Sequence, residues 1–114
     1  ARLGHWELNL ATNALIWSDE TYRIFEMDPS RPPSYEAFLN AIHPEDREKV
    51  LKEWKLALEQ EREARLNFRV LNEEPVSVVS VSHPLRDRAG NLKGYIGQLV
   101  TCAQSDDVFF SKGD

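Results

Sequence analysis

The hydrophobic residues change their spacing at Gln60, and this change constrains the fold more than any other feature of the chain. Over Pro44–Gln60, apolar residues recur at steps of three and four, which predicts one long amphipathic helix. Over Ala64–Val70, apolar and polar residues alternate, which predicts a strand buried on one face. Such a helix and such a strand can both bury their apolar sides when the helix packs on a sheet.

Shorter signals predict the other elements. The further strands are expected over 5–10, 15–17, 76–85 and 92–102. Ser18 and Ser34 each precede a short helical pattern, and a hydroxyl at that position caps the first free amides of a helix. Strands and helices that are grouped in this way predict an α+β domain, with a five-stranded antiparallel sheet and helices packed on one face.

The long helix is preceded by His43, Pro44, Glu45 and Asp46. Proline loses no hydrogen bond at the first helical position, and the helix dipole favours acids in the first turn. A metal site would need further ligands, and the other two histidines stand alone in predicted strands. We interpret His43, Pro44 and Asp46 as a structural helix cap and predict no metal site.

Charge and cysteine content exclude several functions. The 14 Lys and Arg residues against 19 Asp and Glu residues give a net charge of −5, which argues against nucleic-acid binding and docking on anionic lipid. No apolar run approaches the ~20 residues that cross a bilayer, so no membrane insertion is expected. Cys102 is the only cysteine, which excludes an internal disulfide and favours the cytoplasm. The chain has no phosphate-binding loop or nucleophile motif, so we expect no enzyme activity in it.

Several segments, taken together and in order, resemble the PAS domain, the sensory box of bacterial signalling proteins. They include Gly4-His5-Trp6-Glu7-Leu8-Asn9, Ile16-Trp17-Ser18-Asp19-Glu20, His43-Pro44-Glu45-Asp46-Arg47, Pro84-Leu85-Arg86-Asp87 and Tyr95-Ile96-Gly97. The likeness is strongest to the PAS fold-3 type subfamily, whose members begin the long helix with His-Pro-Asp-Asp-Arg. We expect one PAS domain over 1–104 and a linker or tail over 105–114.

The resemblance implies a signal-input domain of a bacterial sensor histidine kinase, alone or as a hybrid with a response regulator, in a two-component phosphorelay. A diguanylate cyclase with a GGDEF domain, or a chemoreceptor, is the alternative parent. The output domain would lie downstream in the same chain, and a homodimer would form through the PAS domain and its flanking helices. Thr101-Cys102-Ala103 stands where the family has a closing Asp-Ile-Thr signature, and Val108-Phe109-Phe110 predicts either a linker helix or an unstructured end.

Aromatic residues at amphipathic positions are candidates either for the lining of a ligand pocket or for an ordinary packed core. The candidate lining residues are Trp17, Tyr22, Phe25, Phe38, Trp54, Phe68, Val81, His83 and Gly97. His83 is expected on one strand face with Val79, Val81 and Leu85, either as a bonded sheet histidine or as a group facing a cavity. With a nearby acid, His83 is also the one candidate for a small α+β enzyme.

The resemblance also bears on cofactors. Light-sensing family members form a flavin adduct through a cysteine near the long helix, whereas Cys102 lies on the last predicted strand. Haem-binding members place a histidine on or beside the long helix, where this chain has none after His43. We therefore expect neither flavin nor haem. The chain either senses an unknown small ligand or serves as a ligand-free dimerisation module.

Overall fold

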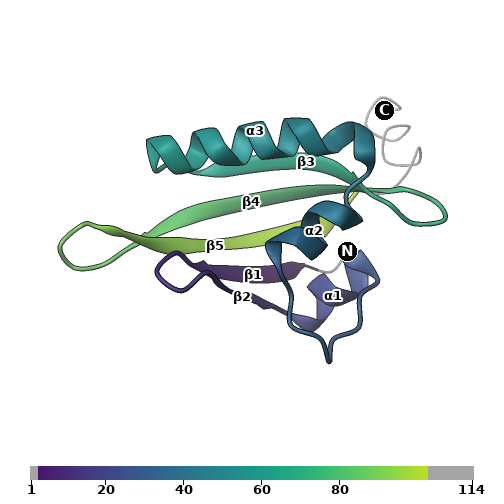
Figure 1. The fold of residues 1–114 in the computed structure, drawn as a ribbon, viewed down its shortest axis with the longest axis horizontal. Helices are drawn as coiled ribbons and strands as arrows, with labels where there is room; N and C mark the ends of the chain where they lie inside the picture. The colour runs from purple at the N-terminus through teal and green to yellow at the C-terminus, as the bar shows by residue number, and fades with distance from the viewer. Residues whose placement is uncertain (1–2, 103–114) are drawn as a thin grey trace, which may run out of the picture.

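Five strands form one antiparallel sheet in the computed structural model, which describes residues 3–102. The strands are β1 (Gly4–Asn9), β2 (Ala14–Trp17), β3 (Ala64–Val70), β4 (Val76–Arg86) and β5 (Leu92–Thr101). Their order across the sheet is β2-β1-β5-β4-β3, so β1 and β5 are neighbours although they are far apart in the sequence (Figure 1). The α+β architecture predicted from the sequence is confirmed.

Three helices connect β2 to β3, and each begins at a side chain that accepts a hydrogen bond from a free backbone amide. The helices are α1 (Asp19–Phe25), α2 (Tyr35–Ala41) and α3 (Pro44–Gln60). The caps are Ser18 Oγ for the amide of Thr21, Ser34 Oγ for that of Ala37 and His43 Nδ1 for that of Glu45, at 3.4, 3.0 and 3.2 Å. Both α1 and α3 end at a glutamate in the left-handed region, Glu26 with φ 54° and Glu61 with φ 52°.

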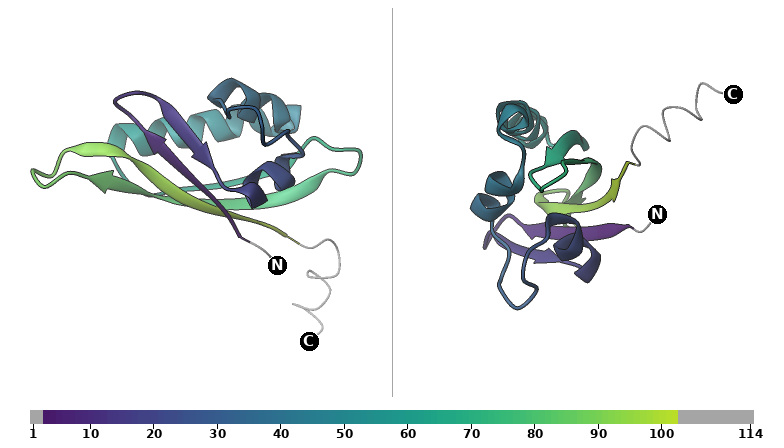
Figure 2. Two further views of the ribbon diagram at one scale, coloured as in Figure 1. Left: turned by 90° about the horizontal axis from the view of Figure 1, so that it is seen from below. Right: turned by 90° about the vertical axis from the view of Figure 1, so that its right-hand side faces the viewer.

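The helices cover one face of the sheet, which we name the inner face (Figure 2). The opposite face is the outer face. Successive residues of a strand point to opposite faces, so neighbours in register share a face. Trp6 of β1, Gly97 of β5 and Ser82 of β4 form such a row on the inner face.

Helix α3 is fixed to the sheet near both of its ends. Near its start, the Asp46 carboxylate accepts a hydrogen bond from the Arg69 backbone amide at 2.8 Å and pairs with the Arg69 guanidinium at 2.9 Å. Near its end, the hydroxyl of Tyr95 on β5 donates to the carbonyl oxygen of Arg62 at 2.8 Å. These contacts hold α3 at a set position over the sheet.

The inner face of β4 differs from the prediction. Ser80 and Ser82 are 3% and 1% exposed and face the helices, whereas Val81 and His83 lie between and beyond them on the outer face. The assignment of Val81 and His83 to a pocket lining is therefore corrected. The small serines occupy the inner face because bulky rings from β1, β5 and α3 fill the space above them.

The packed core joins α1, the start of α3 and the inner face of the sheet. It is formed by Trp17, Tyr22, Ile24, Phe25, Ile42, Val50, Leu66, Phe68, Val70, Val78 and Leu99. Within residues 3–102, no helix combines the length and the hydropathy that are needed to cross a bilayer.

Candidate ligand-binding groove

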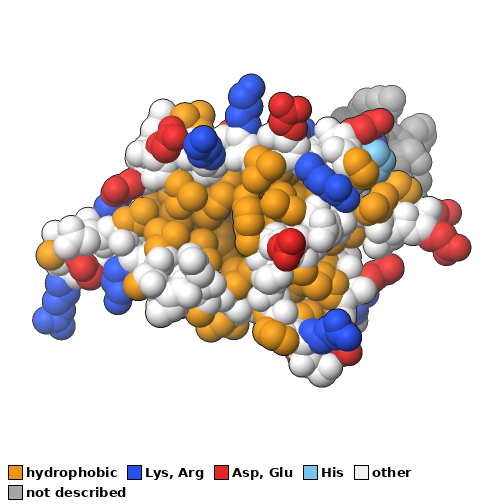
Figure 3. Space-filling view, in the orientation of Figure 1, with side chains coloured by type: hydrophobic (Ala, Val, Ile, Leu, Met, Phe, Trp, Pro, Cys, Tyr) orange, Lys and Arg blue, Asp and Glu red, His pale blue; other side chains and the backbone are white. Residues whose placement is uncertain are grey.

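An open and largely apolar groove lies between the β1–β2 hairpin, α2 and α3 (Figure 3). The sheet contributes Trp6, Leu8, Leu15, Trp17, Leu66, Ser80 and Leu99. The helices contribute Phe25, Tyr35, Phe38, Glu48, Leu51, Lys52, Trp54, Lys55 and Leu58, and the loops contribute Leu10, Asn13, Pro33 and Ser34. The volume of this groove, about 910 Å³, lies within the range of pockets that hold small organic ligands.

Trp6 forms the floor of the groove because β5 has a glycine beside it. A β-carbon on Gly97 would come within 2.5 Å of the Trp6 indole, so a side chain there would displace the ring. The indole reaches over β5 to β4, where Nε1 donates to Ser80 Oγ at 3.4 Å. It also meets Trp54 of α3 edge-on, with 6.1 Å between the ring centroids. Trp6 therefore connects the floor to the helical wall.

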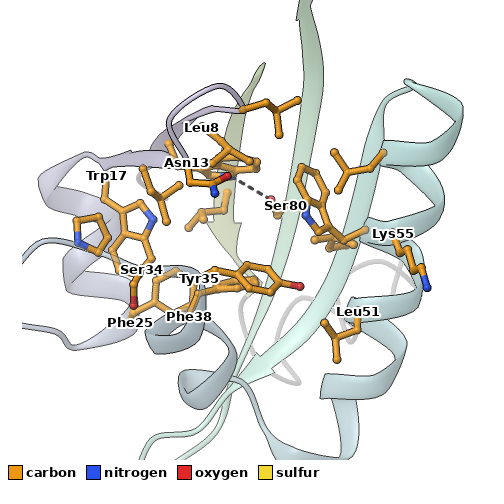
Figure 4. Close-up of a pocket in the computed structure, with 18 of the residues that line it drawn as sticks. Leu8, Asn13, Trp17, Phe25, Ser34, Tyr35, Phe38, Leu51, Lys55 and Ser80 are labelled. Atoms are coloured by element: carbon orange, nitrogen blue, oxygen red, sulfur yellow. Dashed lines mark hydrogen bonds between the residues drawn. The ribbon is translucent and has the colours of Figure 1, made fainter. Parts of the chain in front are cut away.

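Stacked aromatic rings form the end of the groove beside α1 and α2. The rings of Trp17 and Phe25 stack with centroids 5.0 Å apart, and Phe25 meets Phe38 edge-on at 5.7 Å. Tyr35 extends from α2, and its hydroxyl points across the groove towards α3 (Figure 4). Aromatic packing of this kind fixes the rings relative to one another and leaves a defined apolar surface.

The edge of the groove along α3 carries charge. Lys52, Lys55 and Glu48 all line it from this helix. Among the ion pairs within residues 3–102, none involves Lys52 or Lys55. Figure 4 shows Lys55 at the outer side of α3, while Leu51 lies towards the groove. The edge is therefore cationic and the interior apolar.

Four of the nine candidate residues line the groove, namely Trp17, Phe25, Phe38 and Trp54. Two others belong to the core beside it. The Phe68 ring stacks on Phe25 at 6.1 Å between centroids, and the Tyr22 hydroxyl donates to the carbonyl oxygen of Arg31 at 2.9 Å. Trp17 and Phe25 belong both to the groove lining and to the packed core, so the two interpretations of the aromatic set overlap at these residues.

The remaining three candidates lie elsewhere. Val81 and His83 are on the outer face, and Gly97 is covered by the Trp6 indole. His83 Nδ1 is 3.6 Å from Glu63 Oε1, but the two side chains are 61% and 52% exposed. A general acid and base gain strength from a site that excludes water, and this pair has none.

The sequence analysis missed Trp6, Ser80 and the α3 residues Leu51 and Leu58 as lining residues. A signal for Trp6 was present, because it has the same two-residue spacing as Leu8 and Leu10, which predicts that all three lie on one face of the first strand. Ser80 gave no signal, because a serine between two β-branched residues is ordinarily assigned to the solvent side of a strand.

A network of charged residues lies outside the groove, where Asp46 meets Arg69. Hydrogen bonds from the Arg69 guanidinium hold the pKa of Asp46 at about 2, well below its usual value. Glu45 also pairs with Arg69, at 3.1 Å. This network joins α3 to β3, so it positions the wall of the groove without contacting its interior.

A family model, that of the PAS fold, matches residues 14–99. The chain belongs to the PAS family. A solved PAS domain, the N-terminal domain of a diguanylate cyclase with a PAS/PAC sensor from Marinobacter aquaeolei, superposes with a TM-score of 0.78 at 22% identity. That match covers 88% of this chain and 94% of the other, and at this identity it shows the shared fold.

Two longer proteins contain a region similar to this PAS domain. One is the sensor protein FixL of Bradyrhizobium diazoefficiens, which is 32% identical over 108 residues, covering 93% of this chain and 21% of FixL. The other is the probable diguanylate cyclase DgcE of Escherichia coli, which is 24% identical over 98 residues, covering 86% of this chain and 9% of DgcE. The chain thus spans about a fifth of the first relative and about a tenth of the second.

Haem held by histidine, and flavin linked to cysteine, do not fit the groove of this PAS domain. Its described lining residues include no histidine and no cysteine. His5 and His83 lie on the outer face, His43 caps α3 and Cys102 follows β5. In the described part of the chain, no three His, Cys, Asp or Glu residues come together as a metal site would require.

Proposed function

We propose that this PAS domain is the signal-input module of a longer signalling protein and that it senses a small ligand in the groove. The observation that carries the proposal is the groove itself, which is open and apolar and has a volume of about 910 Å³. A PAS domain is a sensory module and not a catalytic one, so the chemistry of the longer protein would belong to another domain. We also propose that the domain works in the cytoplasm, because its single cysteine favours a reducing compartment.

A ligand in the groove would touch three elements at once. Trp6 belongs to β1, Leu99 to β5 and Trp54 to α3, and all three line the groove. A ligand that binds one arrangement of these elements more tightly shifts the population towards that arrangement. Because β1 and β5 are adjacent in the sheet, the shift would reach the segments that follow β5.

Native mass spectrometry tests whether the groove holds a ligand. We expect the chain, purified from bacteria under non-denaturing conditions, to carry a bound small molecule. Leu51→Trp fills the groove from α3 and should abolish the adduct. Leu56→Trp is the matched control, because Leu51 and Leu56 are both 41% exposed and Leu56 does not line the groove. An adduct that persists in Leu51→Trp, or is absent from both the wild type and Leu56→Trp, contradicts the proposal.

For the output, we propose a sensor histidine kinase that acts in a phosphorelay. The higher identity to FixL than to DgcE, 32% against 24%, supports this choice. In the longer protein, incubation with ATP should then produce an acid-labile phosphohistidine. Synthesis of cyclic di-GMP from GTP without such a phosphohistidine would favour the diguanylate cyclase alternative, and the absence of both activities would favour a chemoreceptor.

A second candidate function is dimerisation, which the outer face supports. Val79, Val81 and Ile96 lie there, and Ile96 is 44% exposed. Apolar side chains that are exposed on a sheet face suit contact with a second copy. In sedimentation experiments, Ile96→Glu should then reduce the dimer fraction, whereas Leu71→Glu, at an exposed leucine of the β3–β4 loop, should not. A monomeric wild type would exclude this function for the isolated chain.

A further inference from the structure

The charge along the groove is opposite in sign to the charge of the whole chain. The chain carries a net charge of −5, yet the charged residues of the groove are Lys52 and Lys55 against Glu48 alone. Within residues 3–102, neither lysine has an ion-pair partner. Two ammonium groups are thus available beside an apolar surface, and a bound anion would find no competing protein carboxylate on them.

A third donor faces the groove from α2. Within the described residues, the Tyr35 hydroxyl has no hydrogen bond to another protein group, and it points across the groove towards α3 (Figure 4). Partial burial raises the pKa of Tyr35, so the phenol keeps its proton at neutral pH. The polar groups at this edge can therefore donate hydrogen bonds to an acceptor.

The interior of the groove offers little polar surface to a ligand. Ser80 is the hydroxyl in its floor, and this oxygen already accepts from Trp6 Nε1. No buried side-chain nitrogen or oxygen in the described part of the chain lacks a hydrogen-bond partner. A polar group placed over Leu66 and Leu99 would lose its water without a replacement. The part of a ligand that lies over these two leucines must therefore be apolar.

We propose that the groove binds an amphipathic organic anion, such as a fatty or aromatic carboxylate. Its apolar body would lie between the β1–β2 hairpin and α3, and its anionic group would lie at the α3 edge that carries Lys52 and Lys55, towards which the Tyr35 hydroxyl points. A cationic amphiphile meets two like charges at the same edge, so the groove discriminates against it. This inference rests on the proposed function, that the groove holds a small ligand.

Two fluorescent probes with the same anilinonaphthalene body separate the charge from the apolar fit. N-phenyl-1-naphthylamine is neutral, and 8-anilinonaphthalene-1-sulfonate carries one negative charge. We expect both to bind the chain in titrations at low salt. The double variant Lys52→Gln/Lys55→Gln should lower the affinity for the sulfonate by about fivefold or more. The affinity for the neutral probe should stay within about twofold of the wild-type value. Added salt should weaken the binding of the sulfonate but not that of the neutral probe.

Two control variants test whether the effect is local. Lys49→Gln/Lys93→Gln removes the same charge from lysines that do not line the groove, so it should leave the affinity for the sulfonate unchanged. Glu48→Gln removes the acid from the groove edge, so it should tighten sulfonate binding. In competition, decanoate should displace the sulfonate at lower concentration than decyltrimethylammonium, which has the same chain length and the opposite charge.

The outcomes distinguish this inference from the proposed function. If the neutral probe fails to bind folded wild-type chain, the groove is not a ligand site and the proposed function fails with it. If the neutral probe binds and Leu51→Trp prevents its binding, the groove is a ligand site. In that case, a sulfonate affinity equal in the wild type and in Lys52→Gln/Lys55→Gln, or lowered as much by the Lys49→Gln/Lys93→Gln control, overturns the inference alone.

Discussion

A single glycine decides where the largest side chain of the groove floor can lie. Gly97 leaves the space that the Trp6 indole occupies, and Trp6 in turn contacts β4 and α3. The shape of the groove therefore depends on a residue that has no side chain and does not line it. A substitution at Gly97 should change the groove even though it adds no group to its surface.

We predict that Gly97→Ala displaces Trp6 and lowers the free energy of unfolding by about 1–3 kcal/mol, the usual cost of overpacking. Chemical denaturation measures the loss, and a red shift of tryptophan emission reports the exposure of the indole. In a Trp6→Leu background the clash is absent, so Gly97→Ala should cost much less there. Equal costs in both backgrounds would show that the glycine is needed for another reason.

The lowered pKa of Asp46 predicts how the stability of the fold depends on pH. Its pKa of about 2 in the folded chain lies below the unfolded value of 3.8. The ionised carboxylate therefore stabilises the fold above pH 4, and this contribution is lost as the pH falls from about 4 to about 2. Asp46→Asn should remove up to about 2 kcal/mol at pH 7, less than the full shift implies, because solvent at Arg69 screens the pair.

Denaturation of the wild type and Asp46→Asn across this pH range measures the contribution. The difference between the two proteins should be largest near neutral pH and should shrink below pH 4. Glu53→Gln, on the same helix and outside the Arg69 network, should show no such convergence. A difference that stays constant down to pH 2 would mean that ionisation of Asp46 does not support α3.

At the scale of elements, the ends of the helices carry backbone strain that sequence patterns did not reveal. Helix α1 ends at Glu26 with φ 54°, a conformation in which a β-carbon is unfavourable and which glycine adopts readily. We predict that Glu26→Gly stabilises the chain by up to about 1 kcal/mol in chemical denaturation. Glu53→Gly, inside α3, should instead destabilise it by about 1 kcal/mol. A loss of stability in Glu26→Gly would show that the glutamate side chain contributes more than the strain costs.

The positions and types of the elements followed from the sequence because local signals set them. The change of period after Gln60, the capping serines Ser18 and Ser34 and the cap at His43 all act within a few residues of where they stand. The strand limits likewise follow turn residues. Signals that act within a few residues can be recognised in the sequence without knowing which other element packs against them.

The face of β4 could not be predicted because it depends on distant residues. Val79 and Val81 look like core residues and Ser80 and Ser82 look like surface residues, but the structure has them the other way round. The space above the serines is filled by Trp6 of β1. Alternation shows that a strand has two faces, whereas the choice between them is made by side chains some seventy residues away. The charged edge of the groove was missed for the same reason.

At the scale of the molecule, the groove lies where three structural parts meet, so filling it should affect the output of the longer protein. We predict that Leu51→Trp makes that output insensitive to ligand, because the indole occupies the space that a ligand would use. Leu56→Trp should leave the response intact. The measurement is the output activity of the full-length protein with and without ligand. A ligand response equal in the two variants would separate the groove from signalling.

The pairing of β1 with β5 has a mechanical consequence. Gly4 lies opposite Leu99, so the chain enters the sheet at the place where it leaves it. Tension applied to both ends therefore pulls β1 and β5 apart from the same edge. The hydrogen bonds between these two strands are then broken one after another and not simultaneously. The sheet would therefore separate between β1 and β5 at a low force. The pairing of β1 with β2, and that of β5 with β4 and of β4 with β3, would remain intact.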